Sequence, residues 1–129
     1  MTEPATSILI VDDNPTNLKL VTYLLASRGY DVATAADAPS ALAALAARRP
    51  RLILMDLQLP GMDGLELTRR LKADVATRDI VIVAVTAYAM KGDEERARSA
   101  GCDGYIAKPI DTRTLPKVVA AFIAGTATS

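Results

Sequence analysis

The sequence predicts an α/β domain in which a mostly parallel, five-stranded sheet is covered by helices on both faces. Short apolar runs rich in Val and Ile recur along the chain between polar or turn residues, a pattern typical of strands buried on both faces. Helical patterns separate these runs in strict alternation. Because parallel strands need crossover connections, this alternation with short links favours a doubly wound parallel sheet.

The first strand–helix unit begins with the apolar run at residues 8–11. Asn14 and Pro15 follow as a helix cap and a first-turn proline, and Gly29 ends the helix. The apolar residues that we expect on its inward face are Leu20, Val21, Leu24 and Leu25.

A second unit follows, with a weaker strand at residues 31–35. Asp37 and Pro39 open an Ala-rich helix, which stops at residues 48–50. Its expected inward residues are Ala38, Ala41, Leu42 and Leu45.

The remaining three units repeat this pattern. A strand at 52–56 precedes a turn-rich segment, in which Gly61 and Gly64 are predicted turn formers, and a helix that carries Leu67 and Leu71. The later elements are strands at 80–86 and 104–107, a polar helix at 91–100 and a final helix carrying Leu115, Val118, Val119, Phe122 and Ile123.

Two of these helices have unusual features. The helix at 91–100 offers only Ala97 and Ala100 as apolar residues, so it can bury little surface and we expect it to be the element that moves. In the final helix, a cap at Thr114 would place Pro116 near the start, where proline is tolerated.

Composition bounds the function. The chain has 129 residues, which predicts a single domain over 1–129 with its core at 7–124. Its 15 basic and 15 acidic residues balance, which argues against nucleic acid or an anionic membrane as a partner. It contains no histidine, which excludes Ser-His or Cys-His catalysis and a phosphohistidine on this chain.

Cysteine usage and hydropathy predict a cytoplasmic protein. Cys102 is the single cysteine, so no internal disulfide can form, and we expect it to pack as a small apolar group. The first residues lack a signal-peptide pattern, and every strongly apolar run is far shorter than the roughly 20 residues of a membrane helix.

Polar residues follow four of the five predicted strands, at the edge where ligands bind in open α/β sheets. They are Asp12, Asp13, Asp56, Thr86 and Lys108. Crowded carboxylates favour a hard cation such as Mg²⁺, which in turn can bind phosphate. One carboxylate could then attack phosphorus while Lys108 and Thr86 steady the transferring oxygens, giving an aspartyl phosphate.

Each of these residues also has a structural explanation. Asp12 and Asp13 could serve the first helix, Asp56 a turn, Thr86 a strand, and Lys108 could be a solvated lysine. Their joint placement at one edge is what favours a functional site.

The chain resembles a response-regulator receiver domain of two-component signalling over about residues 7–124. The segments that carry the resemblance are ILIVDDN (8–14), LMDLQLPGMDG (54–64), VTA (85–87) and YIAKP (105–109). The segment MKGDEER (90–96) is especially similar to single-domain receivers of the DivK type and to receivers of hybrid kinases. The resemblance implies a flavodoxin-like (βα)5 fold with strand order 2-1-3-4-5.

The resemblance also implies roles for individual residues. Asp56 would be the phosphoacceptor, with Mg²⁺ bound by Asp13, Asp56 and the carbonyl of Gln58, while Asp12 acts mainly through water. Lys108 would contact the phosphoryl group. The remaining roles implied are a switch pair of Thr86 and Tyr105, a phosphate-binding N–H at Ala87 and a cis peptide before Pro109.

Partners follow from the same resemblance. A receiver takes its phosphoryl group from a phosphohistidine, so the histidine missing here would belong to a sensor histidine kinase or a histidine phosphotransfer protein. We expect no output domain in the chain, and therefore a downstream protein that binds the surface of helix 91–100, strand 104–107 and the final helix. Leu18, at the margin of the first helix's inward stripe, is either a docking residue for the phosphodonor or a rim residue of the core.

Two other functions stay open. One is a receiver-like module that signals by binding alone, although the complete acid set argues against it. The other is a small phosphohydrolase with an aspartate nucleophile, although the chain has no cap domain and no evident acid for the leaving group. We expect a phosphoacceptor rather than an enzyme, with only slow autophosphorylation and autodephosphorylation.

Overall fold

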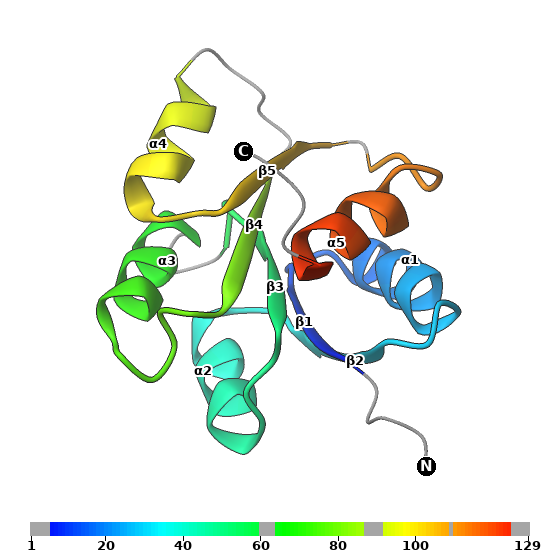
Figure 1. The fold of residues 1–129 in the computed structure, drawn as a ribbon, viewed down its shortest axis with the longest axis horizontal. Helices are drawn as coiled ribbons and strands as arrows, with labels where there is room; N and C mark the ends of the chain where they lie inside the picture. The colour runs from blue at the N-terminus through cyan, green and yellow to red at the C-terminus, as the bar shows by residue number, and fades with distance from the viewer. Residues whose placement is uncertain (1–5, 60–63, 87–91, 109, 125–129) are drawn as a thin grey trace.

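The computed structural model describes residues 6–59, 64–86, 92–108 and 110–124. Five strands and five helices alternate along these residues (Figure 1). The strands are β1 (Ser7–Val11), β2 (Asp31–Ala35), β3 (Leu52–Asp56), β4 (Val81–Thr86) and β5 (Gly104–Ala107). The helices are α1 (Pro15–Ala26), α2 (Ala38–Ala47), α3 (Gly64–Ala73), α4 (Asp93–Ala100) and α5 (Leu115–Ala124).

The strands form one sheet in which every neighbouring pair is parallel. Their order is β2-β1-β3-β4-β5, which confirms the predicted fold class and topology. The central strand β3 is buried along its whole length, whereas the edge strands β2 and β5 are largely exposed or half-buried. The carboxyl ends of β1 and β3, which carry the predicted acids, are therefore neighbours in the interior of the sheet.

Helices cover both faces of the sheet and define two apolar cores (Figure 1). One core lies under α2, α3 and α4 and includes Ile53, Met55 and Leu67. The other lies under α1 and α5 and includes Leu25 and Val119. Alternate residues of each buried strand supply the two cores, because successive side chains point to opposite faces.

The predicted helix starts are confirmed. The side chain of Asn14 accepts hydrogen bonds from the N–H groups of Thr16 and Asn17, and Pro15 opens α1. Asp37 caps α2 in the same way, through the N–H of Ser40. α5 begins at Leu115, and the N–H of Val118 bonds the carbonyl of Thr114, so Pro116 lies in the first turn.

The predicted inward stripes are wrong at two leucines. Leu20 on α1 is 37% exposed and Leu42 on α2 is 43% exposed. Each helix covers the sheet with a narrow stripe, Val21 and Leu25 in α1 and Ala38 and Ala41 in α2, and the leucine beside the stripe turns toward solvent.

The prediction of a thinly packed α4 is confirmed. Ala97 and Ala100 are its buried side chains among the described residues of this helix. Glycines with a positive φ flank it, Gly92 (98°) and Gly101 (107°), so both ends use backbone conformations that other residues rarely adopt. Cys102, in the turn after α4, is buried as predicted.

Within the part of the chain that the structure describes, no helix has the length and apolar character needed to cross a membrane.

Candidate functional site

Three carboxylates meet at the carboxyl edge of the sheet. Asp12 and Asp13 follow β1, Asp56 ends β3, and one oxygen from each lies within 4.8 Å of the others. Asp12 and Asp56 are buried, whereas Asp13 is exposed. The structure thus brings together the acids that the sequence predicts at the ends of the first and third strands.

The local backbone fixes the two buried acids. The N–H of Asp12 bonds the carbonyl of Ala35 at 3.0 Å, and its Oδ1 accepts the N–H of Asn14 at 2.9 Å. Asp56 Oδ1 accepts the N–H of Gln58 at 2.9 Å. In both residues, Oδ1 is held by a backbone donor two residues on, while Oδ2 turns toward a cation.

That cation is Lys108. Its Nζ lies 3.2 Å from Asp56 Oδ2 and 3.3 Å from Asp12 Oδ2. The backbone N–H of Lys108 bonds the carbonyl of Thr86 at 2.7 Å, which anchors the lysine where β5 ends beside β4. The ammonium therefore bridges the two buried carboxylates from a fixed backbone position.

Burial and charge compete in this group. Burial raises the pKa of Asp56, and the nearby Asp12 adds to this effect, while the N–H of Gln58 and the ammonium of Lys108 oppose it. Burial would lower the pKa of Lys108, but the charges and hydrogen bonds of Asp56 and Asp12 outweigh it, so that pKa is raised. Lys108 is thus held as a cation beside a carboxylate that is costly to ionise.

The donor set fits a divalent metal ion. When all are ionised, three carboxylates against one ammonium leave two negative charges in a largely buried group. Carboxylate oxygens are the ligands that Mg²⁺ prefers, and it commonly uses one or two of them beside a phosphate. Asp12, Asp13 and Asp56 are the residues that would hold the ion.

Thr86 and Tyr105 lie on the same face of the sheet. Thr86 pairs with Ala107, and Ala84 pairs with Tyr105, so the two side chains are diagonal neighbours on the face that α3 and α4 cover. Thr86 is buried at the end of β4, beside Asp56 in the sheet order, and the hydroxyl oxygen of Tyr105 is also buried.

Gln58, Ala87 and Pro109 are the remaining residues that the sequence predicts at this site. Gln58 directs its backbone N–H at Asp56 while its side chain is exposed. Ala87 and Pro109, predicted as a phosphate-binding N–H and a cis peptide, lie outside the described residues.

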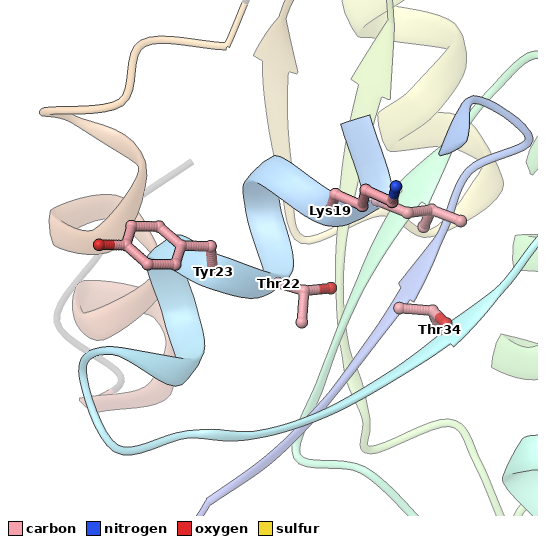
Figure 2. A pocket seen from close by; sticks show the side chains of 5 residues that line it. Lys19, Thr22, Tyr23 and Thr34 are labelled. Atoms are coloured by element: carbon pink, nitrogen blue, oxygen red, sulfur yellow. The ribbon is translucent and has the colours of Figure 1, made fainter. Parts of the chain in front are cut away.

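Leu18 is half-buried and packs against the core under α1 and α5. It also lines a pocket of about 390 Å³ with Lys19, Thr22, Tyr23 and Thr34, between α1 and the edge strand β2 (Figure 2). The side chain thus belongs partly to the core and partly to an accessible surface.

Sequence reasoning missed an exposed apolar surface on α1. Tyr23 is 72% exposed and lies one turn after Leu20, which is itself exposed. The signal was present in the spacing, because Leu20 and Tyr23 are three residues apart and so share a face.

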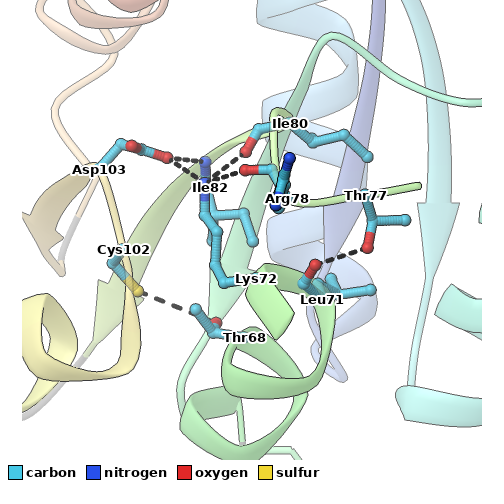
Figure 3. Close-up of polar contacts among 9 residues, drawn as sticks. All are labelled: Thr68, Leu71, Lys72, Thr77, Arg78, Ile80, Ile82, Cys102 and Asp103. Carbon is cyan, nitrogen blue, oxygen red and sulfur yellow. Dashed lines mark hydrogen bonds and ion pairs between the residues drawn. The ribbon is translucent and has the colours of Figure 1, made fainter. Parts of the chain in front are cut away.

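A second polar cluster lies at the opposite edge of the sheet (Figure 3). Lys72 Nζ donates to the carbonyls of Arg78 and Ile80 at 3.1 and 2.8 Å, and lies 2.9 Å from Asp103 Oδ2. The same Asp103 oxygen accepts the N–H of Ile82 at 2.8 Å. This cluster joins the end of α3, the start of β4 and the turn before β5. The ammonium of Lys72 has three partners within the fold, so we interpret the cluster as structural.

Comparison with known proteins agrees with this geometry. The family model of the response regulator receiver domain matches residues 8–120. The polar-differentiation response regulator DivK of Brucella anthropi is 44% identical over 117 residues, which cover 91% of this chain and 95% of that protein. DivK of Brucella ovis is similar to the same extent.

Solved structures share the fold. A putative response regulator from Chloroflexus aurantiacus superposes with a TM-score of 0.89 at 30% identity, covering 94% of this chain and 99% of that one. The receiver domain of a sensor histidine kinase from Pseudomonas aeruginosa, which has a magnesium ion coordinated in its active site cleft, gives 0.85 at 36% identity with the same coverage. On the family match and these relatives, the chain belongs to the response regulator receiver domains of two-component signalling.

Proposed function

We propose that this receiver accepts a phosphoryl group on Asp56, in a reaction that requires Mg²⁺, and that the phosphorylated form presents a changed surface to a partner protein. Receiver domains are phosphoacceptors that bind Mg²⁺ at their acidic site and interact with histidine kinases and downstream targets. The observation that supports the proposal most is the convergence of Asp12, Asp13 and Lys108 on the buried carboxylate of Asp56.

The reaction is an in-line transfer from a phosphohistidine of the partner. An oxygen of Asp56 attacks phosphorus, an O–P bond forms, and the N–P bond to the imidazole breaks. The electron pair stays on the ring nitrogen, and a proton neutralises the ring as it leaves. Bound Mg²⁺ would neutralise charge on the transferring phosphoryl group.

The chain's own residues supply position and charge. We assign to Lys108 a hydrogen bond to an oxygen of the new phosphoryl group, and its ammonium contact with Asp56 Oδ2 at 3.2 Å supports this role. Asp12 holds the same ammonium at 3.3 Å and so keeps it over the site. The hydroxyl of Thr86, at the next strand end, is the second donor that we assign to the phosphoryl group, together with the N–H of Ala87.

Thr86 and Tyr105 would carry the signal outward. If the hydroxyl of Thr86 moves toward the phosphoryl group, it changes the space available to the ring of Tyr105, its diagonal neighbour on the adjacent strand. That ring lies on the face that α4 covers, and Ala97 and Ala100 are the buried side chains among the residues of α4 that the structure describes, so a small change in packing can shift α4. The surface of α4, β5 and α5 is therefore the one that we assign to the downstream protein.

The phosphodonor would dock beside the acids, on α1. We assign Leu18 to this contact because it is half-buried in the pocket between α1 and β2, close after the turn that holds Asp12 and Asp13. The exposed Tyr23 lines the same pocket and extends its apolar surface. A cytoplasmic location is part of this proposal, in line with the single cysteine of the chain.

Intact-mass measurement after incubation with acetyl phosphate tests the reaction. Wild type, Asp56→Asn and the exposed-acid control Asp79→Asn are each treated with and without Mg²⁺. We expect one phosphoryl adduct on wild type and Asp79→Asn, only with Mg²⁺, and none on Asp56→Asn. Rapid release of inorganic phosphate without an accumulated adduct would instead indicate a hydrolase, and no adduct under any condition would indicate a module that acts by binding alone.

A further inference from the structure

We infer that Gly64, the first residue of α3, is a positioning residue for the phosphoacceptor: its missing side chain lets the start of α3 close against the backbone of Asp56. The inference rests on the proposed function, because it concerns the placement of the same carboxylate. Gly64 is eight residues from Asp56 in the sequence, and the sequence predicted it only as a turn former.

Backbone conformation does not explain a glycine at this position. The glycines with a positive φ among the described residues are Gly29, Gly92 and Gly101, and Gly64 is not one of them. It is the first residue of a helix and its φ is not positive, so alanine could adopt the same backbone conformation. The reason for glycine must therefore be what surrounds it.

A Cβ at position 64 would strike the phosphoacceptor's backbone. It would lie 2.3 Å from the carbonyl oxygen of Asp56 and 2.8 Å from the Cα of Leu57. Contacts under 3.0 Å essentially never occur for a real Cβ, so the two segments would have to separate by about 0.7 Å. These are backbone atoms, which have no alternative rotamer to adopt, so the displacement falls on the strand end itself.

The contact is also fastened by hydrogen bonds. The N–H of Gly64 bonds the carbonyl of Leu57 at 3.1 Å, and the N–H of Leu57 bonds the carbonyl of Val85 at 3.0 Å. On the helix side, the buried hydroxyl of Thr68 donates to the carbonyl of Gly64 at 2.7 Å. The start of α3 is thus tied through Leu57 to β4.

The placement of this peptide governs the carboxylate. The next N–H along the chain, that of Gln58, is the donor to Asp56 Oδ1, so a shift of Asp56 and Leu57 moves both the carboxylate and the group that orients it. Misplacing reacting groups by about 1 Å costs on the order of a hundredfold in rate. Gly64 thereby acts on phosphoryl acceptance through Asp56, without touching the reacting atoms.

Paired variants in the full chain test this role. Gly64→Ala adds the clashing Cβ, and Gly29→Ala, at a glycine with nothing within 4 Å of its Cβ position, is the control for a general loss of stability. Thr68→Val removes the hydroxyl that fastens Gly64. Its control is Thr77→Val, because the Thr77 hydroxyl donates to the carbonyl of Leu71 at the far end of the same helix (Figure 3).

Two readouts are needed. The first is the set of amide shifts of Leu57 and Gln58 in the free protein, and the second is the initial rate of phosphorylation by acetyl phosphate with Mg²⁺. We expect Gly64→Ala to displace both amide resonances and to slow phosphorylation by about ten- to a hundredfold. Thr68→Val should have both effects to a smaller extent. The phosphorylation rates of the two controls should stay within about twofold of the wild-type rate, even where urea unfolding shows that the controls are less stable.

The outcomes separate this inference from the proposed function. If wild type itself takes up no phosphoryl group, the proposed function fails, and the amide shifts still test the positioning role. Unmoved Leu57 and Gln58 amides in Gly64→Ala would overturn the role of Gly64, as would a wild-type rate of phosphorylation. If Gly64→Ala does not fold, equal rates for Thr68→Val and Thr77→Val would overturn it instead.

Discussion

The ammonium of Lys108 lies 3.2 Å from Asp56 Oδ2 and 3.3 Å from Asp12 Oδ2, so two carboxylates compensate the burial of its charge. Lys108→Met would remove this cation and leave two buried carboxylates facing each other. Loss of one preorganised donor typically costs about a hundred- to a thousandfold in rate, so we expect phosphorylation by acetyl phosphate to slow to that extent. Lys117→Met, at an exposed lysine of α5, is the control, and a wild-type rate for Lys108→Met would refute the role.

Asp56→Asn should stabilise the fold at neutral pH. Burial raises the pKa of Asp56 above its ordinary value of 3.8. The ionised carboxylate therefore lowers the free energy of unfolding, and this cost is fully present above the native pKa. The amide removes this cost, and the gain should vanish as the pH falls through the native pKa, where the wild-type carboxyl is protonated. Urea unfolding without divalent ions, from pH 7 down to pH 4, measures the difference between the two proteins.

Asp111 provides a control of opposite sign. Its carboxylate accepts the N–H groups of Arg113 and Thr114, which lower its pKa, so its ionised form adds stability above pH 3.8 that is lost as the pH falls through the lowered native pKa. Asp111→Asn should therefore gain nothing at pH 7. A gain for Asp111→Asn equal to that of Asp56→Asn would show that burial of Asp56 is not the cause.

Leu18→Ala distinguishes docking from packing. The phosphodonor for this test is a phosphorylated histidine phosphotransfer protein that transfers its phosphoryl group to the wild type. If Leu18 contacts this donor, transfer to Leu18→Ala should slow about tenfold, which corresponds to a loss of about 1.4 kcal/mol of binding energy. Acetyl phosphate, which is too small to dock on α1, should react at the wild-type rate. Leu42→Ala, at an exposed leucine on the other face, is the matched control. A large loss of stability with normal transfer would assign Leu18 to the core.

Lys72→Met should loosen the edge of the sheet far from the acids. It would leave the carbonyls of Arg78 and Ile80 and the carboxylate of Asp103 without their shared donor, at a cost of about 1–3 kcal/mol in unfolding free energy. Hydrogen exchange should increase first at Ile82, whose N–H bonds the same carboxylate. Unchanged exchange there, with Lys19→Met as the surface control, would contradict the structural role of the cluster.

Periodicity and strand-end chemistry account for what could be predicted. Apolar runs in the sequence identify the buried strands. Parallel topology then brings the strand ends that carry Asp12, Asp56 and Lys108 to one edge of the sheet, so the proximity of these three residues could be predicted from the sequence. The exposure of Leu20 and Leu42 could not be predicted, because a leucine at the margin of the apolar stripe fits the helical pattern whether it faces the sheet or the solvent. The role of Gly64 could not be predicted either, because the need for glycine comes from the nearby carbonyl of Asp56, and this contact is visible only in the structure. The link between Lys72 and Asp103 spans 31 residues and has no periodic signal.

The burial of Cys102 has a practical consequence for following this protein in solution. It is the single thiol of the chain, and burial raises its pKa, so it is a poor nucleophile toward maleimide dyes. A cysteine introduced at Tyr23 or Val75, both 72% exposed, would react far sooner. Fluorescent labels could therefore be attached at chosen surface positions without first removing the native cysteine.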